Sequence, residues 1–327
     1  MKILLVLFRS LGDVCMGTTV LHAVKKKYPD ATIDFMTEKA NVDTLAGNPD
    51  VNNIIVGGSY FEALEVFATG GYDKIYKLNM INHLETAWHH TPSLQNQHLV
   101  EWYGKKADVD VSEDKGIYIY PSEEDNAKAK ALFESLGGDR VIAMHTSSGQ
   151  HSYGAVKDQR VESKDWPVMF FDIIAERLIN KGFKVVQIGA KTDKKMDFEG
   201  VIDLTGQLSF KQTASFLKHC TGYLGLDSGP AYLSGWAGIP TLILMGATQN
   251  QTADKPGPSV GPRDATVHYL NPKRPDNPNC SPVPCYVHCL ISKMGGCIID
   301  ITPDVVWNKF KEIVDVDNKP SLAHHYV

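Results

Sequence analysis

The sequence predicts an α/β protein made of two similar halves, each with a parallel β-sheet covered by helices on both faces. Three observations predict this fold class. At 327 residues the chain exceeds the usual size of one hydrophobic core. Short apolar runs alternate with helical segments in both halves. Most of these runs are apolar throughout, as strands buried on both faces are.

In the first half the expected strands cover residues 2–8, 31–38, 52–58 and 73–78. Between them we expect a helix over 18–27, a short helix and turn over 41–51 and a helix starting at 60. A helix over 122–136 follows. Ser122 has the chemistry of an N-cap, and Gly137-Gly138 stop the helix. We place this helix near the junction between two domains.

The second half repeats the alternation. Strands are expected at residues 140–148, 184–190, 222–228 and 240–247, with helices at 167–183, 209–220 and 230–238. A last helix over 302–314 has Thr302 as its N-cap. The polar stretch 149–162 is expected to be a loop over a cleft. The predicted domains are 1–138 and 139–316, followed by a mobile tail over 317–327.

Composition excludes some functions. The chain is 43% hydrophobic and 22% charged, which is typical of a soluble globular protein. Its formal net charge of -5 argues against nucleic acid as a partner. The apolar run at the N-terminus is too short for a membrane span, and no cleavage site follows it. We therefore expect a cytoplasmic protein.

The six cysteines fall into two groups. Cys15 and Cys220 lie in apolar or helical context and are expected in the core. The other four share one Pro- and Asn-rich segment: Cys280, Cys285, Cys289 and Cys297. They are compatible with reduced thiols, disulfides or a zinc site. Their spacing matches no strong zinc pattern and a cytoplasmic location disfavours disulfides, so reduced thiols are favoured over zinc.

The stretch "LGLDSGPAYLSG" joins an expected strand to an expected helix. Pro230 suits the first turn of a helix, Asp227 or Ser228 can cap it, and Gly229 lets a ligand approach the backbone. Free N–H groups and the positive end of the helix dipole favour a phosphate there. A helix cap that binds nothing explains the same residues, and Asp227 can also accept a hydrogen bond from a ligand hydroxyl.

A second strand–helix junction is "FRSLGDVCMGT" near the N-terminus. Ser10 and Gly12 are expected in a tight turn, with Asp13 at the start of the helix. Asp13 is an ordinary first-turn residue unless it faces the cleft and an acceptor hydroxyl, where it becomes a general-base candidate. The stretch lacks the three-glycine dinucleotide fingerprint and a Walker lysine.

These junctions belong to an ordered series of motifs. In sequence they are "SLGDV", "VIAMHTSSG", Lys164 before Trp166-Pro167, "VVQIGAKTD", "DLTGQLS" and "GLDSGPAYLSGWAGIPTLILMGAT". Together they resemble glycosyltransferase family 9, the family of the ADP-heptose:lipopolysaccharide heptosyltransferases. The resemblance spans most of the chain and is weakest from about residue 70 to 139.

The resemblance implies a GT-B architecture of two facing Rossmann-like domains. Domain 1–138 would bind the acceptor and domain 139–316 the nucleotide-sugar. It also implies inverting transfer with neither metal ion nor cofactor. Asp13 would accept the proton of the acceptor hydroxyl, near Ser10 and Gly12. Lys164 and the N–H groups of Ser228 and Gly229 would hold the diphosphate.

Further residues follow from the same resemblance. Thr146 and Ser147 would add hydroxyl contacts, and Asp193 would meet the nucleotide ribose. Tyr232 stands where the family usually has a histidine. A phenol can donate to a phosphate oxygen but carries no positive charge.

The implied partners are a nucleotide diphosphate-sugar, by resemblance ADP-heptose, and a saccharide or lipid-linked acceptor. Lys25 to Lys27 offer a basic helix end for contact with the inner membrane. Two alternatives stay open: another GT-B enzyme such as a sugar-nucleotide epimerase, or a non-catalytic nucleotide-sugar-binding protein. An assay for the acceptor-linked product separates the first alternative, and Asp13→Asn without functional loss would indicate the second.

Overall fold

The computed structural model describes residues 1–78, 98–148, 164–246, 260–272 and 296–317, with the backbone of 251–252 and 255–256. Its first sheet has the strand order β3-β2-β1-β4, and every pairing is parallel. The strands are β1 (Lys2–Val6), β2 (Thr32–Thr37), β3 (Asn53–Val56) and β4 (Lys74–Lys77).

The second sheet has the order β12-β9-β8-β5-β6-β7 and is also parallel throughout. Its strands are β5 (Val141–Met144), β6 (Lys184–Gln187), β7 (Val201–Asp203), β8 (Gly222–Leu226), β9 (Thr241–Leu244) and β12 (Val267–Leu270). Two-residue strands β10 (Gln251–Thr252) and β11 (Lys255–Pro256) pair antiparallel. The predicted α/β class with two parallel sheets is confirmed. The edge strands β7 and β12 were not predicted.

Helices connect the strands of both sheets. Before residue 110 they are α1 (Leu11–Lys27), the 3-10 helix η1 (Lys39–Asn41), α2 (Val42–Leu45), α3 (Tyr60–Thr69) and α6 (Leu99–Lys106). After it come α7 (Glu123–Ser135), α8 (Val168–Asn180), α9 (Phe210–Leu217), α10 (Gly229–Ala237), the 3-10 helix η4 (Gly296–Asp300) and α11 (Pro303–Ile313).

Two predicted helix caps are confirmed. The Ser122 side chain accepts from the backbone N–H of Asp125, whose carboxylate accepts from Ser122 in return. The Thr302 side chain accepts from Val305 N–H at the start of α11.

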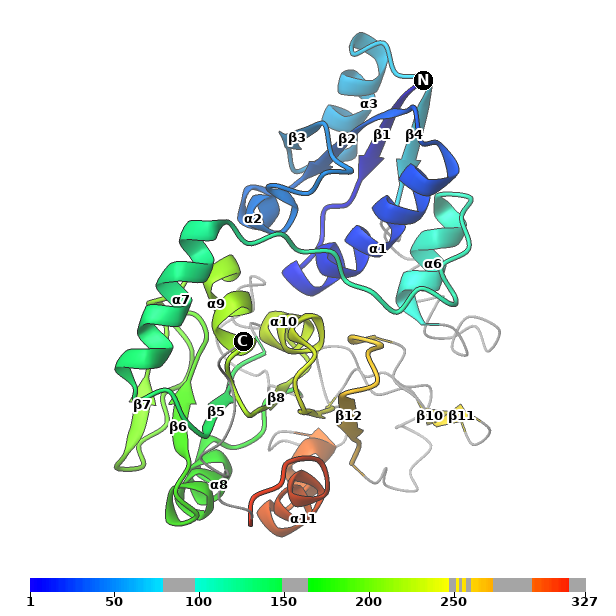
Figure 1. Cartoon of the computed structure of the whole chain (residues 1–327). Helices are drawn as coiled ribbons and strands as arrows, with labels where there is room; N and C mark the ends of the chain where they lie inside the picture. The colour runs from blue at the N-terminus through cyan, green and yellow to red at the C-terminus, as the bar shows by residue number, and fades with distance from the viewer. Residues whose placement is uncertain are drawn as a thin grey trace.

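Figure 1 shows two lobes, one around each sheet, with a connecting segment that runs from α6 to α7. Although it precedes residue 138, α7 packs on α9 of the second lobe. Asn126 and Ser215 hydrogen-bond at 2.8 Å, and the rings of Phe133 and Phe216 meet edge to face. Packing therefore groups α7 with the second sheet, while the domain boundary at 138 stays a prediction.

The core of the second lobe lies partly under α8 and α11. The Trp166 ring is buried against Phe171, and its N–H donates to the Ile301 carbonyl at 2.7 Å. Cys15 and Cys220 are buried, as predicted for core residues. Among the described residues, no helix combines the length and apolar character needed to cross a membrane.

Truncating the core side of α11 tests this packing. Phe310 is fully buried, so Phe310→Ala should lower the free energy of unfolding by roughly 3–5 kcal/mol. Val305 on the same helix is 47% exposed, and Val305→Ala should change it by no more than about 0.5 kcal/mol. Urea denaturation of both variants makes the comparison, and equal losses would contradict the assignment of the buried face.

Candidate functional site

The N-termini of α1 and α10 meet between the two lobes (Figure 1). A Cβ added to Gly229 would lie 2.7 Å from Leu11 Cδ2, so the first turns of the two helices are in contact. Neither helix is capped by the serine at its N-cap position, because the side chains of Ser10 and Ser228 make no capping hydrogen bond. Two positive helix ends therefore converge on one region, which favours an anion there.

Gly12 has a different role from the predicted one. It was expected in a tight turn before the helix, but it is the second residue of α1. A Cβ at this position would lie 2.5 Å from Cε2 of Tyr232. The glycine is needed because the Tyr232 ring covers α1 at this point.

Asp13 is held by several groups of its own lobe. Its Oδ1 accepts from the Tyr103 hydroxyl at 2.5 Å and lies 3.8 Å from Nε of Arg9, while its Oδ2 accepts from the Ser10 hydroxyl. The residue is 8% exposed. The carboxylate is therefore fixed close to the contact between α1 and α10. Sequence reasoning missed Arg9 and Tyr103; Tyr103 lies 90 positions further along the chain.

Lys164 and Asp227 form an ion pair in the second lobe. Lys164 Nζ donates to Asp227 Oδ2 at 2.9 Å, and both side chains are largely buried. The N-cap position of α10 belongs to Ser228. Asp227 thus keeps a lysine ammonium next to the start of α10, in an ion pair without net charge.

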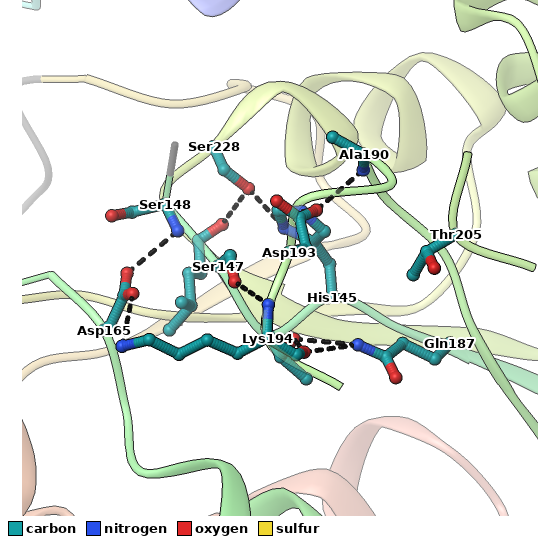
Figure 2. A network of polar contacts seen from close by, with 12 residues as sticks. His145, Ser147, Ser148, Asp165, Gln187, Ala190, Asp193, Lys194, Thr205 and Ser228 are labelled. Atoms are coloured by element: carbon teal, nitrogen blue, oxygen red, sulfur yellow. Dashed lines mark hydrogen bonds and ion pairs between the residues drawn. The ribbon is translucent and has the colours of Figure 1, made fainter. Parts of the chain in front are cut away.

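Figure 2 shows a second polar chain at the same place, from Ser228 through His145 to Asp193. Ser228 Oγ lies 2.8 Å from His145 Nδ1 and 3.1 Å from the Leu226 carbonyl oxygen. His145 Nε2 lies 3.0 Å from Asp193 Oδ2, which also accepts from Ala190 N–H. Asp193 therefore faces a histidine, and its predicted contact with a ribose stays a prediction. His145 was missed, although it directly follows β5, where parallel sheets place ligand-binding residues.

Thr146 and Ser147 hold the loop after β6. The Thr146 hydroxyl donates to the Lys194 carbonyl at 2.6 Å and accepts from Gln187, and Ser147 Oγ accepts from Lys194 N–H. Both residues have no exposed surface. Their hydroxyls were expected to contact a ligand. The structure shows protein partners for both hydroxyls, which satisfy polar groups of this loop, and their contact with a ligand stays a prediction.

Tyr232 lies between the lobes. It is 4% exposed, and its hydroxyl accepts from Gly261 N–H at 3.0 Å. Burial, with the nearby charges of Asp227 and Asp13, raises the pKa of Tyr232 well above its ordinary value, so it stays neutral. The structure places it in the interlobe packing, and its contact with a ligand stays a prediction.

Gly261 is fixed from both sides. Its carbonyl oxygen lies 2.9 Å from His98 Nε2, while His98 Nδ1 accepts from Val100 N–H. The proton of a neutral imidazole must then sit on Nε2. Burial and the Arg263 charge lower the pKa of His98 to about 3, which agrees with the neutral form.

The cysteine cluster is mostly outside the described residues, since only Cys297, in η4, belongs to them. The alternatives for Cys280, Cys285 and Cys289 are therefore untested. Among the residues that the structure describes, no group of three or more His, Cys, Asp or Glu side chains is arranged to hold a metal ion.

The structure defines an α/β protein with two parallel sheets and with two helix N-termini that meet between its lobes, and sequence comparison makes the class specific. The model of "Glycosyltransferase family 9 (heptosyltransferase)" matches residues 79–281. The chain belongs to this family and is a glycosyltransferase. Lipopolysaccharide heptosyltransferase 3 of Escherichia coli is 23% identical over 281 residues, covering 73% of this chain and 82% of the relative.

Solved structures share the fold. The family 9 glycosyl transferase of Veillonella parvula has a TM-score of 0.68 at 19% identity, covering 95% of this chain and 96% of that one. The E. coli ADP-heptose lps heptosyltransferase II has a TM-score of 0.64 at 17% identity, covering 96% and 98%. The E. coli heptosyltransferase WaaC, solved with ADP-2-deoxy-2-fluoro heptose, has a TM-score of 0.57 at 14% identity, covering 95% and 99%.

Removing one hydroxyl tests how Asp13 is held. Tyr103→Phe should lower the free energy of unfolding by roughly 1–3 kcal/mol, because a buried carboxylate oxygen loses its donor. Tyr118→Phe is the matched control, since that hydroxyl makes a longer contact of 3.2 Å to Asp114 at a part-buried site. Its loss should be smaller in urea denaturation. A larger loss for the control than for Tyr103→Phe would contradict the assignment.

Proposed function

We propose that this protein transfers a heptose from a nucleoside diphosphate-heptose to a saccharide hydroxyl of a lipopolysaccharide-type acceptor. The observation that carries the proposal is the contact between the uncapped start of α10, with Lys164 beside it, and the start of α1, with Asp13. A diphosphate needs the N–H groups and ammonium at the start of α10, and an attacking hydroxyl needs a base such as Asp13. The names of the relatives support heptose as the sugar and ADP as the nucleotide.

The donor is proposed to bind with its diphosphate at the start of α10. The N–H groups of Ser228 and Gly229 would donate to the phosphate oxygens, and Lys164 would supply a full positive charge. In the free protein Asp227 accepts from Lys164 at 2.9 Å, which holds the ammonium at the site before the ligand arrives. Such a prearranged donor set costs little reorganisation when the leaving group develops charge.

The proposed reaction is a single displacement with inversion. The acceptor oxygen forms a bond to the anomeric carbon while the bond from that carbon to the diphosphate oxygen breaks. The electron pair of the broken bond stays on the diphosphate, and the proton of the acceptor hydroxyl passes to Asp13. In this scheme Lys164 and the backbone N–H groups stabilise the leaving diphosphate without a metal ion.

The acceptor is proposed to approach from the first lobe, where Asp13 is held by Tyr103 and Ser10. Contact with a membrane surface through Lys25 to Lys27 stays a prediction. Two of these lysines already have partners in the protein: Lys25 donates to the Ala31 carbonyl at 2.8 Å, and Lys27 pairs with Asp108 at 2.6 Å. Of these partners only Asp108 is charged, so it offsets the charge of Lys27 and leaves that of Lys25.

Asp13→Asn separates catalysis from binding. It should abolish transfer while leaving donor affinity nearly unchanged, because only the proton acceptor is removed. Donor binding is measured by calorimetry and transfer by detection of the acceptor-linked product. Donor affinity that falls in parallel with the rate would refute the role of Asp13 as a base.

Lys164→Ala tests the diphosphate site. Loss of a charged hydrogen bond of about 1.5–3 kcal/mol should weaken ADP binding roughly 10- to 100-fold. Lys195→Ala is the matched control, because Lys195 is an exposed lysine of the same lobe that pairs with Asp203 at 2.7 Å. Its ADP titration should match that of the unmodified protein. A titration curve unchanged by Lys164→Ala would remove the lysine from the site.

Before either variant, a thermal-shift panel of nucleoside diphosphates and their sugars identifies the nucleotide, because a ligand that binds the folded state raises its apparent stability.

A further inference from the structure

The chain Ser228–His145–Asp193 is continuous and largely buried. His145 is 4% exposed, and only 8% of the Asp193 side chain is accessible. Each end of the imidazole has one partner, with Ser228 Oγ at 2.8 Å and Asp193 Oδ2 at 3.0 Å (Figure 2). Ser228 is also the residue whose backbone starts the proposed diphosphate site. The histidine therefore touches the site only through Ser228.

The Ser228 hydroxyl has one proton, and the protonation of His145 decides where it can point. With a neutral imidazole that donates from Nε2 to Asp193, Nδ1 is an acceptor and takes the Ser228 proton. With protons on both nitrogens, Nδ1 donates to Ser228 Oγ instead. The Ser228 proton is then available to another acceptor, which is the Leu226 carbonyl oxygen at 3.1 Å in the free protein and a phosphate oxygen when a diphosphate binds.

We propose that His145 is a positioning residue for the leaving diphosphate. Held by Asp193, it donates to Ser228 Oγ and so turns the Ser228 proton toward a phosphate oxygen. This inference rests on the proposed function, because it assumes that a diphosphate binds at the start of α10. It assigns His145 and Asp193 to the site through Ser228, with Asp193 acting on a histidine and not on a ribose.

The backbone is shaped to hold Asp193 against the imidazole. Gly189, directly before the turn that carries Asp193, has φ +138°, and an added Cβ would lie 2.2 Å from Asp193 Oδ2 and 2.8 Å from His145 Cδ2. The same carboxylate oxygen accepts from Ala190 N–H at 2.7 Å. Only glycine permits this close approach, so the contact between the carboxylate and the imidazole is built into the loop.

Tyr223 on β8 is a second, independent sign of an unsatisfied site. It is fully buried beside Ser228, and its hydroxyl has no hydrogen-bond partner of normal geometry in the described part of the chain. Burial, with the charges of Asp193 and Asp227, raises the pKa of Tyr223, so it keeps its proton. Buried hydroxyls without partners are rare, and a bound ligand or water at Ser228 would provide one.

The arrangement has a pH signature. In the described part of the chain, the titratable groups around the imidazole are Asp193, Tyr223 and the Asp227–Lys164 pair next to Ser228. Because the proposed diphosphate is bound better when both imidazole nitrogens carry protons, its affinity should be higher at acidic than at alkaline pH.

Two isosteric substitutions separate the two halves of the chain. The amide nitrogen of Asn overlays Nδ1 of histidine and can donate to Ser228 at every pH, whereas Gln reaches the position of Nε2 and Asp193. The probe is ADP, titrated by calorimetry at pH values from about 5.5 to 8.5. We expect His145→Gln to weaken ADP binding about tenfold at low pH, which corresponds to one lost hydrogen bond. His145→Asn should keep the low-pH affinity and lose the part of the pH dependence that the histidine contributes, leaving only that of the ADP terminal phosphate.

Further variants keep the inference falsifiable. Ser228→Ala combined with His145→Gln should bind no more weakly than Ser228→Ala alone, because His145 acts through Ser228. Gly189→Ala should reproduce His145→Gln with the imidazole still present. Thermal unfolding midpoints check that every variant is folded.

The outcomes distinguish this inference from the proposed function. If the unmodified protein binds neither ADP nor any other nucleoside diphosphate, the proposed function itself fails. If it binds ADP and His145→Gln has the same affinity and pH profile, the role of His145 is overturned and the proposed function stands. Equal losses for His145→Asn and His145→Gln, both without pH dependence, would show a structural role only and would also overturn it.

Discussion

The close approach of α1 and α10 is the contact on which the rest of the site depends. It exists because Gly12 and Gly229 lack side chains: a Cβ at either would lie 2.5 Å from Tyr232 or 2.7 Å from Leu11. Helix N-termini repel each other electrostatically, so bringing two together needs packing to hold them. The Tyr232 ring on Gly12 provides that packing, and the shared positive region is the result.

The second lobe is tied to the first around this contact. Arg263 donates to the Val111 carbonyl at 2.8 Å, His98 reaches the Gly261 carbonyl, and Lys211 donates to the Ala46 carbonyl at 2.5 Å. Each bond joins a buried or half-buried side chain of one lobe to the backbone of the other. Because the acceptors are backbone carbonyls, these bonds hold the two lobes together without depending on the side chain at the accepting positions.

The sequence predicted the fold and the two junctions because both are local properties. A buried strand that ends in Asp227-Ser228-Gly229 is visible in one short window, and parallel topology then places both junctions at strand ends. The partners of the site were not visible. Tyr103 reaches Asp13 across 90 positions, and Thr146 differs from a ligand-facing hydroxyl only in which way it points. Contacts between residues far apart in the sequence, and the direction in which a side chain points, are set by tertiary packing. His145 was within reach, since its place after β5 is itself a local signal.

Charge balance explains how the proposed diphosphate site can contain several carboxylates. Two unit charges 4 Å apart interact by roughly 4 kcal/mol near a protein surface, so an unpaired aspartate would oppose the ligand. Here Asp227 is paired with Lys164, Asp193 faces His145, and Asp13 is held by Tyr103, Ser10 and Arg9. With each carboxylate occupied by a partner, an arriving phosphate meets mainly helix N–H groups and one ammonium. The carboxylates then serve to orient donors, and the proposed base among them, Asp13, belongs to the lobe opposite the proposed diphosphate site.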